Sequence, residues 1–228
     1  MKDHRSRTRR PRPQPRHNNN HALHRRLRRD LSFIGKELRL SLQNVMQAME
    51  EQDRVRAGGL IPDLKQLQAR EDASREVCLR ILALTRGNND ELRWTRSTHS
   101  ILTLMEKSSD EIRTIARNVA RIPPGPSFPF VRDLPVMGRV AGEMLQRSTR
   151  AVLRPEAAFA RRIIASDSSL DRRRDAFAEK VRRFLSVYPE ATRSLLPYLR
   201  ISKNLERIGD HASQMAAEVI YFLGETSG

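Results

Sequence analysis

Cysteine, aromatic residues and long apolar runs are all scarce in this sequence of 228 residues. Its single cysteine, Cys78, excludes an internal disulfide and any metal site built from cysteines alone. No apolar run approaches the roughly 20 residues that a helix needs to cross a bilayer, and the basic N-terminus lacks the apolar segment of a secretory signal peptide. We therefore expect a cytoplasmic protein without a transmembrane segment.

Signatures of catalysis are also missing. The sequence has no glycine-rich phosphate loop, no G-x-S-x-G nucleophile turn and no H-E-x-x-H zinc motif. Cys78 and His99 flank one predicted turn between helices, but a lone cysteine and a lone histidine on helices are usually core or surface residues. We expect that the protein is not an enzyme.

Positive charge is concentrated at the N-terminus. The formal net charge is +16, and residues 1–30 hold eleven lysine and arginine residues against two acidic ones, a net of +9. Residues 1–26 contain three prolines and few apolar residues, so we expect them to be a disordered arginine-rich tail. A solvated extension is the simpler interpretation, because the tail has no aromatic residue for base stacking. Residues 1–29 could also bind nucleic acid or anionic lipid.

The rest of the chain has the composition and periodicity of helices. Apolar residues recur at helical spacing in six segments, which glycine- or proline-containing breaks separate, and no stretch alternates as a strand does. The predicted helices cover about 27–51, 62–84, 91–121, 134–154, 156–188 and 190–223. We predict an all-α fold of two tandem antiparallel three-helix bundles. The first bundle would span residues 27–122, a proline-rich linker 123–130 and the second bundle 131–224.

The two halves repeat at an offset of 100 residues. The matched positions include the apolar stripe, with Ile101 against Ile201. They also include an acid pair, with Glu106 and Asp110 in the first half and Glu206 and Asp210 in the second. A third pair of the same spacing, Asp167 and Asp171, lies in the predicted 156–188 helix. We interpret the chain as a duplicated three-helix unit.

The last helix breaks two local rules at its acid pair. Glu206 and Asp210 lie one turn apart, where like charges repel by a few tenths of a kcal/mol. Gly209 between them costs a helix interior up to about 1 kcal/mol. Such breaks mark functional or closely packed positions. On a helical wheel this pair and its first-half counterpart fall opposite the apolar stripe, so we expect them on the outer surface.

Carboxylates one turn apart can chelate a hard cation, or share iron or zinc with ligands from another helix. A solvated helix face explains any single pair, but the repetition at matched positions favours sites for a divalent or trivalent metal ion. The candidate ligands are Asp167, Asp171, Glu206, Asp210, Glu106 and Asp110. His211 lies nearer the core edge, and we expect it to be a packed or capping residue.

The C-terminal segment ISKNLERIGDHASQMAAEVIYF, residues 201–222, resembles the signature of the PhoU family of phosphate-uptake regulators. Members of that family consist of two tandem three-helix bundles, with an acid-x-x-x-Asp motif on the second and third helix of each. The resemblance implies that the six candidate ligands are metal ligands. Carrying Asp167 and Asp171 back by 100 residues reaches Leu67 and Glu71, so the first half keeps only the third-helix motif.

The resemblance also implies a function. Such proteins are non-enzymatic cytoplasmic adaptors between the ATPase subunit of a phosphate ABC transporter and a phosphate-sensing histidine kinase. They act as negative regulators of the phosphate-starvation response and form homodimers or higher oligomers. Two alternatives stay open. One is a helical nucleic-acid-binding protein that uses the basic tail and the arginine runs of the second half, and the other is a metal-binding bundle unrelated to phosphate.

Overall fold

The computed structural model describes residues 16–85, 89–125 and 128–224. Its helices are α1 (Arg16–Glu50), α2 (Arg54–Gly59), α3 (Ile61–Leu84), α4 (Asn89–Ala120), α5 (Asp133–Leu153), α6 (Ala157–Val187) and α7 (Thr192–Phe222), with 3-10 turns η1 (Pro129–Arg132) and η2 (Pro189–Ala191). The described residues contain no strand. The predicted all-α class with six long helices is confirmed.

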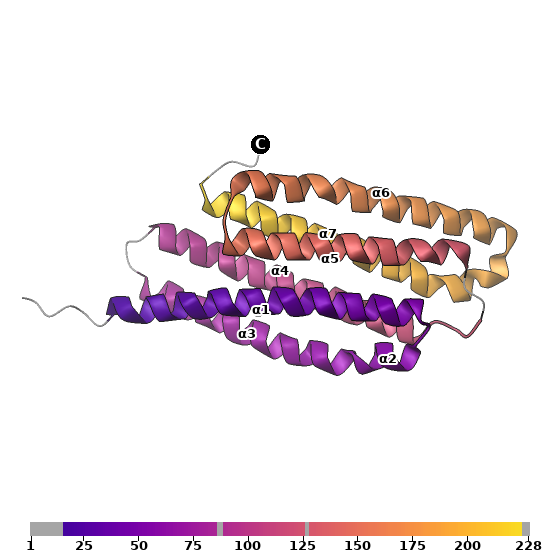
Figure 1. Ribbon diagram of the computed structural model, residues 1–228, viewed down its shortest axis with the longest axis horizontal. Coiled ribbons are helices and arrows are strands. Elements are labelled where there is room, and N and C mark those ends of the chain that lie inside the picture. The colour runs from indigo at the N-terminus through magenta and orange to yellow at the C-terminus, as the bar shows by residue number, and fades with distance from the viewer. Residues whose placement is uncertain (1–15, 86–88, 126–127, 225–228) are drawn as a thin grey trace, which may run out of the picture.

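The long helices run side by side along the long axis of the molecule (Figure 1). Helices α1, α3 and α4 pack together as the first bundle, and α5, α6 and α7 as the second. The bundles meet along two helix pairs, α1 with α5 and α4 with α7. Helix α7 thereby contacts three long helices, α4, α5 and α6, and little of its circumference faces solvent. In the described part of the chain, no helix is long and apolar enough to cross a membrane.

The first helix begins earlier than the sequence analysis predicted. Residues 1–15 lie outside the described residues, but α1 begins at Arg16 and residues 16–26 are helical, so the predicted disordered tail is too long. The side chains of α1 explain this extension. Leu23 packs against the core, and His24 Nε2 lies 2.8 Å from Glu91 Oε1 of α4. The His24 ring also lies against Trp94 of α4, tilted by 51° with its centroid 4.7 Å away. These contacts hold a segment whose composition alone indicated disorder.

The predicted break between the 27–51 and 62–84 helices contains a further short helix, α2. Helix α1 ends at Glu50, and Gln52 takes the positive φ of 55° that reverses the chain. The Asp53 side chain then caps α2 by accepting a hydrogen bond from the Arg56 backbone N–H at 2.8 Å. Both glycines of this break lie inside α2, where Ala57 is buried. A side-chain cap and one buried residue therefore outweigh the low helix propensity of the glycine pair.

Small residues bring α1 and α5 close together across the bundle interface. A Cβ built on Gly35 of α1 would stand 2.3 Å from Thr149 Oγ1 of α5. One built on Gly138 of α5 would stand 2.7 Å from Met46 Cγ of α1. Because both distances are shorter than a van der Waals contact, only glycine fits at either position without a shift of the opposing side chain.

Candidate metal site in the second bundle

Three carboxylates converge where α6 meets α7. Asp167 and Asp171 lie one turn apart on α6, and Asp210 faces them from α7. One oxygen of each lies within 4.8 Å of the others, and all three side chains are partly buried. Within the described ranges, no other group of three or more His, Cys, Asp or Glu side chains is placed to share an ion.

Gly209 sets the distance between the two helices at this point. A Cβ on residue 209 would stand 2.6 Å from Leu170 Cδ2 and 3.3 Å from Asp167 Oδ1. Leu170 is fully buried, so it has little room to move. The sequence analysis marked this glycine as a functional or closely packed position, and its close packing allows Asp210 to approach the two aspartates of α6.

The electrostatic environment of the cluster disfavours bare charge. Burial raises the pKa of Asp167 to about 6, with Asp210 and Asp171 adding to the rise and the Ser213 hydroxyl opposing it. Burial, Glu206 and Asp171 likewise raise the pKa of Asp210. Asp167 Oδ1 is buried and has no hydrogen-bond partner among the described residues. A cation would relieve both the mutual repulsion and this unpaired oxygen, and an all-oxygen ligand set suits a hard ion.

Glu206 lies beside the cluster but is already neutralised. Its Oε1 accepts a hydrogen bond from Arg174 Nη2 at 3.1 Å, and the same guanidinium contacts Asp175 at 3.0 Å. The structure therefore brings together three of the four second-half candidates and places Glu206 in an ion pair next to them.

The acid pair of α7 does not lie where the helical wheel placed it, whereas Asp110 of the first-half pair is exposed as expected. The expectation of an outer surface opposite the core is wrong for Glu206 and Asp210, which are partly buried on the flank of α7 that faces α6. The wheel assumed one buried stripe per helix. Because α7 packs against three helices, its buried arc is wider than that stripe.

The first-half pair does not form a comparable cluster. Glu106 accepts a hydrogen bond from Arg75 of α3, and Asp110, which is exposed, accepts one from Arg113 one turn along α4. Glu71, at the position matched to Asp171, is fully buried, and neither of its oxygens has a hydrogen-bond partner in the described part of the chain.

Sequence reasoning missed the arginines that accompany these acids. Arg174, Arg75 and Arg113 each lie three or four residues after an acidic position on the same helix, a spacing that brings opposite charges together. That spacing was a usable signal. What it could not show is that Arg75 and Arg174 reach across to a carboxylate on the neighbouring helix, whereas Arg113 pairs with a carboxylate on its own helix.

His211 and Cys78, the other residues considered as candidates, are held in the packing between helices and lie outside the cluster. His211 faces α4, with its Nδ1 3.4 Å from Ser108 Oγ, and so lies at the bundle interface rather than in the cluster. Cys78 is fully buried, and burial raises the pKa of its thiol to about 12, so the thiolate is not formed at neutral pH.

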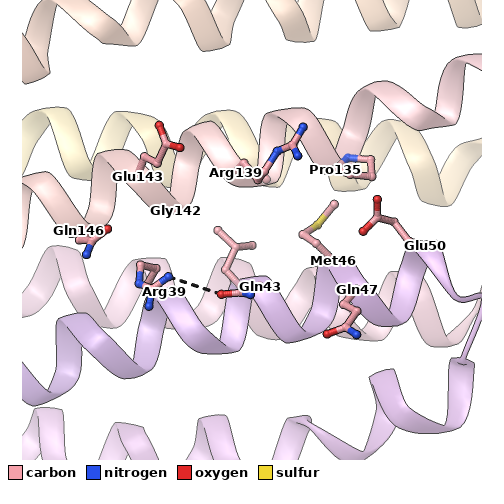
Figure 2. Close-up of a pocket in the computed structure, with 12 residues that line it drawn as sticks. Arg39, Gln43, Met46, Gln47, Glu50, Pro135, Arg139, Gly142, Glu143 and Gln146 are labelled. Carbon is pink, nitrogen blue, oxygen red and sulfur yellow. Dashed lines mark hydrogen bonds between the residues drawn. The ribbon is translucent and has the colours of Figure 1, made fainter.

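A groove lies between α1 and α5, and none of the residues that line it belongs to the carboxylate cluster (Figure 2). Met46 lies between the two helices, and side chains of both charge signs line the groove, among them Arg39, Glu50, Arg139 and Glu143. Because basic and acidic side chains both line it, the groove presents no surface of a single charge sign to an ion.

Comparison with known proteins shows what this chain is similar to. Residues 134–219 match the PhoU domain family. The chain is 26% identical over 196 residues to a phosphate-specific transport system accessory protein PhoU homolog of Zymomonas mobilis, covering 86% of this chain and 82% of the relative. It is 23% identical over 197 residues to the phosphate-specific transport system accessory protein PhoU of Escherichia coli, covering 86% and 82%.

Solved structures agree with these relatives. The crystal structure of PhoU from Pseudomonas aeruginosa superposes with a TM-score of 0.86 at 25% identity, covering 90% of this chain and 99% of that one. A PhoU structure from Streptococcus pneumoniae, at 21% identity and a TM-score of 0.82, has the same fold. The resemblance to the PhoU family is therefore confirmed, with the PhoU domain match lying in the second bundle of a chain that has the PhoU fold.

Proposed function

We propose that this protein is a non-enzymatic accessory and regulatory protein of phosphate transport. The observation that carries the proposal is the likeness to phosphate-specific transport accessory proteins over 86% of the chain, together with the same two-bundle fold. In this role the protein works in the cytoplasm as a homodimer or higher oligomer. It binds the ATPase subunit of a phosphate ABC transporter and a phosphate-sensing histidine kinase, and it damps the starvation response when phosphate is plentiful.

The regulatory part of the proposal is tested in the host cell. A phosphate-starvation reporter gene is measured at high phosphate in the wild type, in a deletion strain and in the deletion strain that expresses this chain. The reporter is expected to be active in the deletion strain and silent again on complementation. A reporter that stays silent in the deletion strain would contradict the negative regulatory role. Co-purification with the ATPase subunit and the kinase tests the adaptor role separately.

We also infer that the second bundle binds a divalent or trivalent metal ion, with iron or zinc expected. Asp167 and Asp171 of α6 and Asp210 of α7 would hold it, and the partnerless buried oxygen of Asp167 supports this assignment. Bound there, the ion joins α6 to α7 and neutralises their mutual repulsion. Glu206 and Arg174 flank the site and fix the charge around it. The metal thereby stabilises a surface that the partners recognise.

The metal assignment is tested by elemental analysis and calorimetric titration. The wild type is compared with the Asp167→Asn, Asp171→Asn, Asp210→Asn variant, which removes the charges but keeps the side-chain shapes. A matched control, Asp72→Asn with Asp175→Asn, removes two exposed carboxylates outside the cluster. Metal is expected in the wild type and the control and absent from the cluster variant. Equal metal content in wild type and cluster variant would remove these residues from the site.

One observation supports a second candidate function, the binding of nucleic acid. Helix α6 exposes arginines in pairs about three turns apart, at 161–162, 172–173 and 182–183, so positive charge recurs along the outer side of the second bundle. The test is DNA binding over a range of salt concentrations, with the Arg172→Ser, Arg173→Ser variant and a chain that lacks residues 1–15. Deletion to residue 29 is unsuitable, because α1 already contributes Leu27 to the core. Absence of binding at low salt would exclude this function.

A further inference from the structure

The first bundle contains a counterpart of the metal site that the repeat predicts. At the offset of 100 residues, Glu71, Glu106 and Asp110 take the places of Asp171, Glu206 and Asp210. They come from α3 and α4, which pack together as α6 and α7 do. Three of the four acidic positions are therefore kept in both bundles, and the difference between the bundles lies in the residues around them.

Two guanidinium groups reach the acidic positions of the first bundle. Arg113 donates to Asp110 and also to Gln68 Oε1 at 3.2 Å, and Arg75 donates to Glu106 and Asp72. Both arginines are largely withdrawn from solvent, with side chains 13% and 24% exposed. The Nε of Arg113 is buried without a hydrogen-bond partner among the described residues. The cations are thus packed into the α3–α4 contact and do not lie across its surface.

At the positions of these two arginines the second bundle has no positive charge. Arg113 corresponds to Ser213, and Arg75 corresponds to Asp175, whose side chain is 67% exposed. In turn, Asp167, the aspartate with the partnerless oxygen, corresponds to Leu67, which is buried. At the compared positions the first bundle has lost two carboxylates and gained two cations relative to the second. Arg174, which pairs with Glu206 in the second bundle, corresponds to Ser74 in the first.

These changes leave the first bundle unfit for a metal ion. A cation would have to displace Arg75 and Arg113 from their carboxylates, and two partly buried guanidinium groups would then lose their partners, which is a large penalty in a low-dielectric contact. A guanidinium also satisfies a carboxylate as a cation does, because it brings positive charge and several donors to its oxygens. The charges of Glu106 and Asp110 are therefore already met there. Glu71 keeps two buried oxygens without a partner among the described residues, but burial raises its pKa to about 7 and so favours its neutral form, which gives a cation less charge to bind.

We propose that Arg75 and Arg113 take the place of a metal ion in the first bundle, so that the chain binds metal only in the second. This inference rests on the proposed metal site at Asp167, Asp171 and Asp210. The α3–α4 contact is then held by built-in charges, whereas the α6–α7 contact depends on the supply of metal. The two halves of a duplicated fold have divided into a metal-independent bundle and a metal-responsive one.

The experiment measures metal bound per chain in three proteins, after removal of metal and titration with iron(II) or zinc. The first is the wild type, and the second is the Asp167→Asn, Asp171→Asn, Asp210→Asn variant. The third is the Leu67→Asp, Arg75→Ala, Arg113→Ser variant, which gives the first bundle the acid and the serine of the second. We expect the second protein to lose all bound metal and the third to bind twice as much as the wild type.

Each outcome decides between the two proposals. The inference would be overturned if the second protein still bound metal and lost it when Glu106 and Asp110 were also replaced, by Gln and Asn. Absence of metal from the wild type would overturn the proposed metal function alone. In that case metal gained by the third protein would still show that the arginines exclude it, and no gain would overturn the inference as well. Circular dichroism of the third protein verifies that it is folded, and Arg113→Lys, which keeps the charge, is expected to bind no more metal than the wild type.

Discussion

Gly209 of α7 lies against Leu170 of α6 so closely that a Cβ on residue 209 would stand 2.6 Å from Leu170 Cδ2. Leu170 is fully buried and is flanked on α6 by Asp167 and Asp171. The helix contact and the carboxylate cluster therefore depend on the same glycine.

Substitution of Gly209 by alanine is expected to weaken both the α6–α7 contact and metal binding by the carboxylate cluster. Overpacking of this kind costs about 1–3 kcal/mol, and the gain in helix propensity returns up to about 1 kcal/mol, so a net destabilisation of roughly 1 kcal/mol should appear in urea unfolding. Metal affinity should fall as well, because the added methyl group separates α7 from Asp167. Gly58→Ala is the matched control, since nothing lies within 4 Å of its Cβ position. That variant should be unchanged or more stable, and a similar loss in both variants would contradict the role of the close contact.

Metal binding should weaken in mild acid. The pKa of Asp167 is raised to about 6, so a proton competes with the cation below that pH and the carboxylate is free to bind above it. Affinity is expected to fall by about tenfold for each pH unit below 6 and to level off above it, as one proton is released on binding. Titrations at pH 5, 6 and 7.5 in non-chelating buffers measure the effect. A constant affinity over this range would show that Asp167 is not a ligand.

Glu71→Gln should make the protein more stable at neutral pH. Burial raises the pKa of Glu71 to about 7, against the opposing effects of Arg75 and Arg113. An acid whose pKa is higher in the folded than in the unfolded state lowers stability as pH rises between the two values, here from 4.5 to about 7. The glutamine variant has no ionisable group at this position and so lacks this loss of stability. Its advantage should grow from near zero at pH 4 to as much as roughly 3 kcal/mol at pH 8. The free energy of unfolding of the two proteins is measured by chemical denaturation across this pH range. A difference between them that does not change with pH would contradict the prediction.

The contact of Gly35 with Thr149 should control how tightly the two bundles join. In Gly35→Ala the new Cβ meets Thr149 Oγ1 and Cγ2 at 2.3 and 2.5 Å, which predicts a loss of roughly 1–3 kcal/mol. Thr149→Ala removes both atoms, so the double variant should recover part of that loss. A double-mutant cycle by chemical denaturation measures the recovery, and strict additivity of the two substitutions would show that the helices separate without strain.

Much of the fold follows from local pattern. Apolar residues at helical spacing located all six long helices, and the breaks at Pro155 and Pro189 fall between α5 and α6 and between α6 and α7. The misplacements arose where tertiary contacts or a side-chain cap overrode composition. His24 and Leu23 hold the start of α1 on the core, and Asp53 allows α2 to include two glycines.

The candidate site divides in the same way. The sequence by itself determined which residues are acidic, their spacing of one turn and the presence of a glycine among them, because these are properties of a single helix. Only the tertiary structure decided that Asp167, Asp171 and Asp210 meet while Glu206, Glu106 and Asp110 are held by arginines. A helical wheel describes one helix with one neighbour. The identity of each carboxylate's partner depends on which flank of α7 or α4 faces the next helix, and that is fixed by the packing of the bundle.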